Sequence, residues 1–164
     1  MAPVRGILRS PGACPAGCRL QVITYDRRGF GRSDKPNTGY TYDTLTADLH
    51  TLLEALELTD TTLVGFSMGG GEVARYFTKY GTDRVRSVVF AAAVPPPPYM
   101  MRGQDNSDGP LTKDAAAEMT SGLTNDEDSF YDDFTRQFFS VNGELKVTEQ
   151  QRQEALRLCK QADK

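Results

Sequence analysis

Tryptophan is absent from this sequence of 164 residues, histidine occurs once, and neither sign of charge dominates. The formal net charge of -3 excludes the basic surface that nucleic acid or acidic membranes attract. No apolar run approaches the roughly 18 residues that span a bilayer, and the amino-terminal residues lack the continuous apolar segment of a secretory signal. We therefore expect a cytoplasmic protein that binds neither nucleic acid nor membrane.

Cysteine is also scarce, with only Cys14, Cys18 and Cys159, and the odd number argues against a disulfide framework. Three residues separate Cys14 from Cys18, where common zinc and redox motifs have two, and no histidine lies nearby. We expect incidental thiols and no bound metal. The composition of 38% hydrophobic and 25% charged residues fits a soluble globular protein with a single core.

The central part of the chain alternates between strand and helix patterns. A leucine stripe predicts a helix over residues 42–58 with one buried face, and a second helix is expected after the glycines at 69–71, up to about Tyr80. Gly81 is expected to end that helix in a left-handed conformation. Strand patterns occur in three runs, at residues 20–26, 61–66 and 86–93. This alternation predicts the α/β class, with a parallel sheet and right-handed crossovers.

Composition divides the chain into three segments. Residues 1–18 are rich in proline and glycine and are expected to be mostly irregular, although Val4, Ile7 and Leu8 are compatible with a short strand. Residues 19–98 hold the α/β core and end in Pro95–Pro98, a stiff connector. Residues 99–164 carry no strand pattern and are expected to form a separate helical layer.

Helix signals recur in this last segment. Asn125 is a candidate cap for a helix that opens with acidic residues, and Thr148 with Gln151 forms a capping box for a final helix. Three aromatic residues fall four apart on one face of the first of these helices: Phe130, Phe134 and Phe138. Such a stripe usually packs against a neighbouring helix, and the alternative is contact with a substrate.

The stretch LVGFSMGGGEVARY, residues 63–76, has the form of a nucleophile elbow, in which a serine occupies a sharp turn between a strand and a helix. Ser67 is the candidate nucleophile. Gly65 and Gly69 are expected to remove side chains that would collide where strand and helix cross. The backbone N–H of Met68 is expected at the helix start, where it favours an oxyanion. An inert glycine-rich turn is the alternative, and the glycines match no phosphate-binding motif.

Three stretches in this order, VITYDRRGFGRSDKP, GFSMGGGEVARY and AAAVPPPPY, resemble the α/β-hydrolase fold family. More narrowly, they resemble its cofactor-free, non-heme chloroperoxidase and perhydrolase branch, close to small arylesterases. The resemblance runs from about Leu20 to Tyr99, and the helical segment that follows resembles the lid of that family. It implies an acyl-enzyme on Ser67, with a small ester or carboxylic acid as substrate and water or hydrogen peroxide as second acceptor. It implies no cofactor.

The same resemblance implies a catalytic acid and a histidine after the lid, and a His-Gly motif before residues 20–26. The sequence shows none of these. Unless Val4 to Leu8 take the place of the missing strand, a gap in the sheet beside the elbow is expected, and we interpret the chain as a truncated member of the family. By itself it is expected to be inactive or nearly so. The alternative is a hydrolase-fold protein that has lost catalysis and serves as a binding or regulatory module.

We considered two residues as substitutes for the absent base and acid. His50 shares a polar helix stripe with Asp43 and Glu54, so it is expected to face water and not to act as the base. Asp26 is expected to hydrogen-bond its own loop. The arginines of that loop, Arg27 and Arg28 among them, suggest an anionic ligand or a solvated, salt-bridged loop, and the second reading is favoured.

Overall fold

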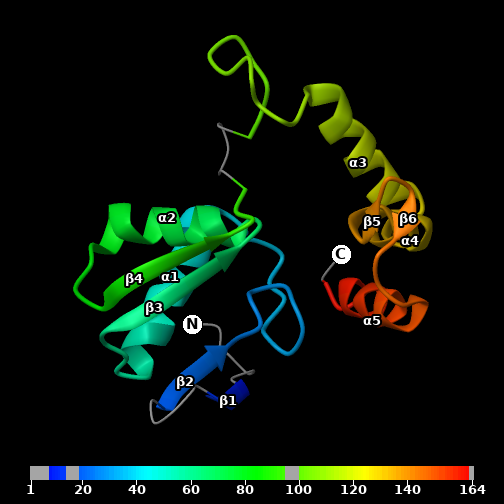
Figure 1. Cartoon of the computed structure of the whole chain (residues 1–164). Coiled ribbons are helices and arrows are strands. Elements are labelled where there is room, and N and C mark those ends of the chain that lie inside the picture. Colours follow the sequence, from blue (N-terminus) through cyan, green and yellow to red (C-terminus); the bar gives the residue numbers. More distant parts are fainter. Residues whose placement is uncertain (1–7, 14–18, 95–99, 163–164) are drawn as a thin grey trace. The chain divides into compact units, whose positions relative to one another are not determined.

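The computed structural model describes residues 8–13, 19–94 and 100–162, in two compact units that we describe separately (Figure 1). None of the described helices is both long and apolar enough to cross a membrane. The first unit consists of β1 (Leu8–Ala13), β2 (Arg19–Thr24), α1 (Tyr42–Ala55), β3 (Thr61–Phe66), α2 (Gly69–Tyr80) and β4 (Val85–Ala91). The second consists of α3 (Lys113–Asn125), α4 (Glu127–Phe138), β5 (Ser140–Val141), β6 (Glu144–Leu145) and α5 (Glu149–Cys159).

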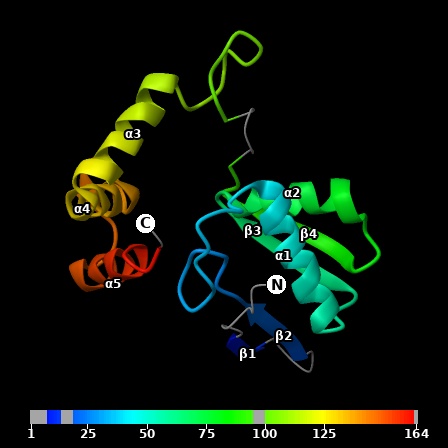
Figure 2. The same ribbon diagram turned by 180° about the vertical axis from the view of Figure 1, so that it is seen from behind.

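The core of the first unit lies between the two helices and one face of a parallel sheet. β3 and β4 pair in parallel, as predicted, and Figures 1 and 2 show α1 and α2 on the same side of them. The leucine stripe of α1 is buried. Its side chains meet those of α2 and the strands in one apolar cluster, which consists of Leu49, Leu53, Leu63, Val73, Tyr76 and Val85.

The ends of both helices depart slightly from the prediction. α1 ends at Ala55, and Glu57 just beyond it has a positive φ of 52°, which a continuing helix cannot contain. Gly81 ends α2, and its N–H donates to the carbonyl of Phe77. Its φ of 70° is positive as expected, whereas its ψ of -153° is far from the left-handed helical value.

Among the described residues β2 does not pair with β3 or β4, so the three predicted strands do not form one continuous sheet. It pairs antiparallel with β1, which occupies part of a segment that we expected to be irregular. Among the described residues β3 pairs with β4 alone, so no strand connects β2 to β3. Strands that are not adjacent belong to one sheet only if further strands connect them. Here β2 makes its backbone hydrogen bonds with β1. The expected gap beside β3 is therefore present in the described part of the chain.

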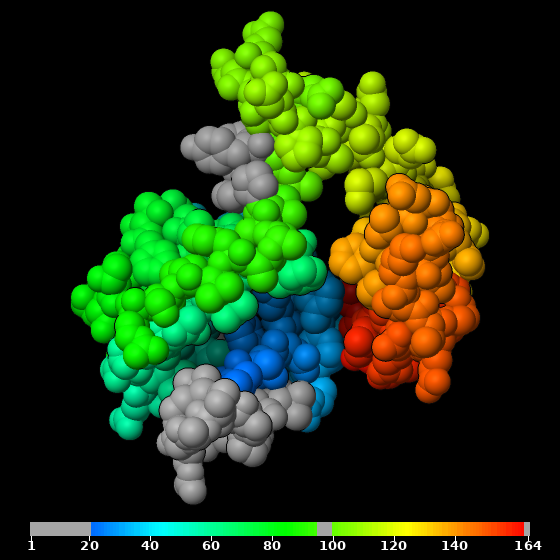
Figure 3. Space-filling model, in the orientation of Figure 1, coloured from blue at the N-terminus to red at the C-terminus, as the bar shows by residue number. Residues whose placement is uncertain are grey.

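The second face of the β3–β4 sheet is open. The alternation of β3 places Val64 and Phe66 on this face, and the strand register puts Val89 of β4 opposite Val64. These three side chains are 64%, 58% and 47% exposed, respectively. The atoms of β4, in green, lie at the surface in the space-filling view (Figure 3). We call Val64, Phe66 and Val89 the open face.

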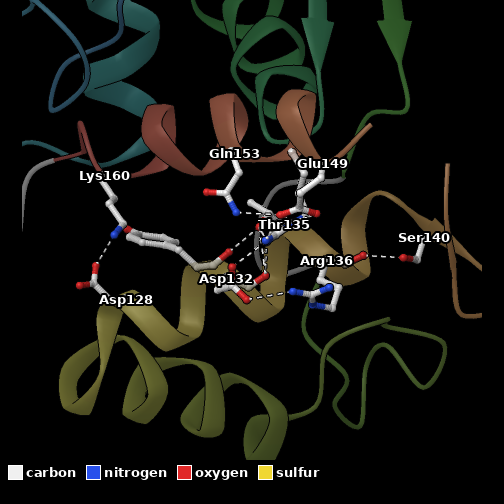
Figure 4. Close-up of polar contacts among 10 residues, drawn as sticks. Asp128, Asp132, Thr135, Arg136, Ser140, Glu149, Gln153 and Lys160 are labelled. Carbon is white, nitrogen blue, oxygen red and sulfur yellow. Dashed lines mark hydrogen bonds and ion pairs between the residues drawn. The ribbon is translucent and has the colours of Figure 1, made fainter. Parts of the chain in front are cut away.

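A buried arginine joins α4 to α5 in the second unit. Arg152 is 2% exposed, and its guanidinium donates to the carboxylates of Asp132 and Glu149 at 2.7 and 2.6 Å and to the Thr135 hydroxyl at 3.0 Å. Figure 4 labels these three partners. The capping box of Thr148 and Gln151 at the start of α5 is present as predicted.

Two features of the second unit correct the prediction. The cap of α4 is Asp126, whose carboxylate accepts the N–H of Ser129, because α3 continues through Asn125. A short hairpin, β5–β6, occurs where no strand was expected. Asn142 and Gly143 form its two-residue turn with φ of 53° and 79°, the positive values that tight hairpin turns require.

The aromatic stripe of α4 lies on one face of the helix as predicted. The rings of Phe130 and Phe134 stack with centroids 6.3 Å apart, and those of Phe134 and Phe138 with centroids 5.8 Å apart. Phe134 and Phe138 remain 42% and 55% exposed. Within this unit the stripe is therefore only partly covered. The prolines at 95–98, predicted to be a stiff connector, lie outside the described residues.

Candidate active site

Ser67 occupies the turn between β3 and α2 and has a backbone φ of +51°. This conformation costs a residue other than glycine about 1–2 kcal/mol, so surrounding contacts must hold it. The N–H of Ser67 donates to the carbonyl of Ala91 at 3.3 Å, and its carbonyl accepts from the N–H groups of Gly70 at 3.0 Å and Val94 at 2.9 Å. The strained turn is thus fixed to α2 and to the segment around the end of β4.

Gly65 lies where β3 passes under the start of α2. A Cβ atom added to it would lie 2.6 Å from the carbonyl oxygen of Gly69 and 2.9 Å from the Cα of Gly70, closer than side chains approach backbone. The expected collision does not occur at Gly69 itself. A Cβ there would meet only the guanidinium of Arg27, at an ordinary 3.6 Å. The strand–helix crossing therefore needs glycine at 65 and not at 69.

The two following glycines are the tightly packed ones in α2. A Cβ on Gly70 would overlap the side chain of Ala93, and a Cβ on Gly71 would lie 2.6 Å from the ring of Tyr42. Both neighbours lie outside α2, on α1 and after β4, so the pattern of α2 alone could not show which glycine they approach. Close packing around the first turn of α2 thus comes from three segments: β3, the residues after β4, and α1.

Met68 is the residue that caps the start of α2. Within the described part of the chain, its N–H donates to no protein acceptor and the hydroxyl of Ser67 makes no hydrogen bond. Unpaired N–H groups at a helix start attract anions, because they carry the positive end of the helix dipole. Among the described residues, the turn therefore presents a hydroxyl and a neighbouring N–H that no other protein group occupies.

A buried carboxylate lies in the first turn of the same helix, and sequence reasoning missed it. Glu72 is 2% exposed, accepts a hydrogen bond from the Tyr25 hydroxyl at 2.7 Å, and forms an ion pair with Arg27. Burial, and then the negative charge of Glu72, raises the pKa of Tyr25, so the phenol stays protonated and donates. The burial of Glu72 could have been predicted from the sequence, because Glu72 lies on the same helix face as Val73 and Tyr76, which are also buried.

His50 is half-buried, so the expectation that it faces water was wrong. Its ring stacks on Tyr80 at a centroid distance of 3.8 Å, and its Nδ1 lies 3.3 Å from the Tyr76 hydroxyl. Its Nε2 lies 3.5 Å from a carboxylate oxygen of Glu54. The polar stripe of α1 that contains His50 packs against Tyr76 and Tyr80 of α2. The residue pattern of α1 alone could not show this contact. Tyr76 is nine residues beyond Ser67, or ~13 Å along the helix axis, so these contacts hold His50 away from the elbow.

The loop after β2 is internally hydrogen-bonded, as predicted. The carboxylate of Asp26 accepts the N–H of Arg32 at 3.0 Å, and the carbonyl of Asp26 accepts the hydroxyl of Ser33 at 2.5 Å. Arg28 forms two hydrogen bonds of 2.8 Å with the carboxylate of Asp48 on α1. The loop arginines are thus paired with carboxylates, which supports the salt-bridged reading.

Metal-ligand groups do not gather in the residues that the structure describes. No group of three His, Cys, Asp or Glu side chains is placed there to hold an ion. Cys159 is a half-buried free thiol, and burial raises its pKa. Cys14 and Cys18 lie outside the described residues.

Comparison with known proteins gives the family. The sequence model of the alpha/beta hydrolase fold matches residues 9–155. A provisionally named non-heme chloroperoxidase of Synechocystis is 46% identical over 122 residues, which are 74% of this chain and 43% of that protein. A bifunctional esterase/perhydrolase of Acinetobacter calcoaceticus is 36% identical over 114 residues, 70% of this chain and 40% of that protein.

Among solved structures, the crystal structure of a bromoperoxidase from Bacillus anthracis is 51% identical and superposes with a TM-score of 0.81. The match covers 87% of this chain and 51% of the bromoperoxidase. The chain therefore spans about half the length, or less, of the proteins that it matches. The family match, the parallel β3–β4 pair and the strand–serine–helix turn agree: the chain belongs to the α/β-hydrolase fold family, with non-heme haloperoxidases and esterases among its relatives.

Proposed function

We propose that Ser67 is the nucleophile of a serine hydrolase of the esterase and perhydrolase type. The observation that carries the proposal is the strained φ of +51° at Ser67, between a strand and a helix, beside the unpaired N–H of Met68. Residues other than glycine in this conformation are uncommon, and they cluster at active sites. The hydroxyl that the turn displays is the group that acyl transfer needs.

The proposed reaction has two steps. Oγ of Ser67 attacks the carbonyl carbon of a small ester, its proton passes to a base, and the oxyanion that forms is stabilised by the N–H of Met68. Collapse of this intermediate expels the alcohol, which takes up the proton, and leaves an acyl-enzyme. Water or hydrogen peroxide then attacks the acyl carbon, so that the acid or the peracid leaves and the Ser67 hydroxyl is restored. Protein groups supply the nucleophile and the oxyanion donor, so the scheme uses no cofactor.

Among the described residues, no side chain is placed to act as the base that takes the proton of Ser67. His50 is held by Tyr76, Tyr80 and Glu54, and no carboxylate or imidazole bonds the Ser67 hydroxyl within the described residues. Hydrolases that lose triad members retain only about 10³ to 10⁴-fold acceleration over water. We therefore propose that this chain alone turns over esters slowly. The same observation favours a second candidate function, a hydrolase-fold binding or regulatory module without catalysis.

Labelling with a fluorophosphonate separates the two candidates. The reagent phosphonylates activated serines, and intact-mass and peptide mapping locate the adduct. We expect one adduct on Ser67, none in Ser67→Ala, and an unchanged adduct in Ser129→Ala, which removes an exposed serine of α4. Reversible binding of an ester analogue without any adduct would support the binding module. Slow p-nitrophenyl acetate turnover that Ser67→Ala leaves unchanged would overturn the nucleophile assignment.

A further inference from the structure

The ion pair of Arg27 and Glu72 lies against the first turn of α2. Arg27 comes from the loop after β2, and Glu72 is five residues beyond Ser67. The Glu72 carboxylate is shared, since Oε1 accepts the Tyr25 hydroxyl and Oε2 pairs with the Arg27 guanidinium. The Glu72 carbonyl in turn accepts the hydroxyl of Thr46 from α1 at 3.3 Å. Two separate segments, the loop after β2 and α1, therefore meet α2 at this one residue.

Stability alone is a weak reason for such a pair. The side chain of Glu72 is 3% exposed and that of Arg27 is 21% exposed, so both charges lose most of their hydration. A buried ion pair often adds little net stability over apolar side chains of the same size, and its better-attested contribution is to fix one arrangement of the chain. The position of the ion pair shows which part of the chain it holds in place.

The ion pair of Arg27 and Glu72 lies next to the elbow because the guanidinium packs against Gly69. The Nη2 atom of Arg27 lies 3.6 Å from the place where a Cβ of Gly69 would stand, so the guanidinium packs on the backbone directly after Met68. Tyr42 packs in the same way against Gly71. The glycine run thus leaves room for side chains from outside α2 to hold its first turn.

We propose that Arg27 and Glu72 are positioning residues, whose ion pair clamps the first turn of α2 to the loop after β2 and so fixes Ser67 and the N–H of Met68. The catalytic part of this inference rests on the proposed function of Ser67. The guanidinium also neutralises Glu72, whose unpaired negative charge near the turn would oppose a developing oxyanion. Without Arg27, the buried carboxylate of Glu72 loses its cation, so it is expected to move toward water and release the turn.

The neighbouring arginine provides a matched control. Arg28 belongs to the same loop, is 15% exposed, and pairs with Asp48 on α1, so Arg28→Met also removes a half-buried ion pair. Its partner is on α1, and of these two arginines only Arg27 lies within 4 Å of a Cβ placed on Gly69. Arg27→Met should therefore loosen the turn at Ser67, and Arg28→Met should leave that turn unchanged. Arg27→Lys keeps the charge and tests rescue.

Amide hydrogen exchange and phosphonylation kinetics, both on the full chain, provide the test. The N–H groups of Gly70 and Gly71, which bond to the carbonyls of Ser67 and Met68, should exchange faster in Arg27→Met and not in Arg28→Met. The maximal rate of phosphonylation at Ser67 should fall about 10- to 100-fold in Arg27→Met, because small misplacements of reacting groups have effects of that size. The reagent concentration for half-maximal rate should stay unchanged, and Arg27→Lys should recover part of the rate.

Equal exchange of these two amides in Arg27→Met and Arg28→Met would overturn the clamp, as would an unchanged labelling rate in Arg27→Met. Failure of the unaltered chain to react with the fluorophosphonate would count against Ser67 as nucleophile. The exchange measurement decides the clamp in that case as well. The two proposals can therefore fail separately.

Discussion

Replacing Gly65 by alanine should destabilise the first unit, while the same replacement at Gly69 should not. A Cβ at position 65 meets the carbonyl oxygen of Gly69 at 2.6 Å and the Cα of Gly70 at 2.9 Å. These are backbone atoms, so β3 and α2 have to separate to admit the methyl group. At position 69 the methyl group meets only the end of the Arg27 side chain, at 3.6 Å.

The magnitude follows from these contacts. Overpacking of this kind costs about 1–3 kcal/mol in the free energy of unfolding. Alanine in place of a helical glycine gains up to about 1 kcal/mol, which makes Gly69→Ala neutral or stabilising. The two variants should therefore differ by about 1–4 kcal/mol, and a difference of about 2 kcal/mol is about 30-fold in the unfolding equilibrium.

Urea unfolding followed by tyrosine fluorescence measures this difference. The chain has no tryptophan, and five of its seven tyrosines lie in the first unit, so the signal reports mainly on that unit. With a slope of about 1–3 kcal/mol per molar urea, the two midpoints should lie roughly 1 M apart. A midpoint for Gly65→Ala equal to or above that of Gly69→Ala would refute the reasoning.

Three further predictions concern the backbone and the second unit. Ser67→Gly should raise the urea midpoint by the equivalent of about 1 kcal/mol, because glycine tolerates a φ of +51°, and should abolish phosphonylation; an unchanged or lower midpoint would contradict the strain. Gly143→Ala should cost about 1 kcal/mol in urea unfolding monitored by circular dichroism, since φ is +79° and nothing lies within 4 Å of the added methyl group. Hydrogen bonds from Arg152 hold the pKa of Glu149 at about 2 and lower that of Asp132, so these carboxylates stabilise the second unit above their unfolded pKa values of about 4. That stability should be lost as the pH falls from about 5 toward 2, and the acid dependence of the thermal midpoint should be weaker in Arg152→Met.

The parts of the fold that depend on local chemistry could be predicted from the sequence. The stripe that includes Leu49 and Leu53 fixes the buried face of α1, since a helix brings residues three and four apart together. The apolar run before Ser67 and the glycines after it give the strand–turn–helix order of the elbow. The capping box at Thr148 is equally local, because both of its hydrogen bonds join residues three apart.

The features that were missed depend on distant partners. Which glycine is tightly packed depends on Tyr42 and Ala93, and neither position is marked in the pattern of α2. Burial of Glu72 depends on Arg27, 45 residues earlier in the chain. His50 looked exposed because only its own helix was considered, and the ring that covers it belongs to Tyr80. The β5–β6 hairpin is the exception, since its Asn-Gly turn was a local signal that went unused.

The open face of the first unit affects how the protein behaves in concentrated solution. Val64 and Phe66 lie on a strand, TTLVGF, that contains no charged residue and no proline, and this strand has one unpaired edge in the described structure. A bare strand edge beside apolar side chains recruits further strands from other molecules, and charged residues normally prevent this. We therefore expect β3 to promote association of this chain at high concentration, and Val64→Lys, which places a charge on the open face, to reduce it.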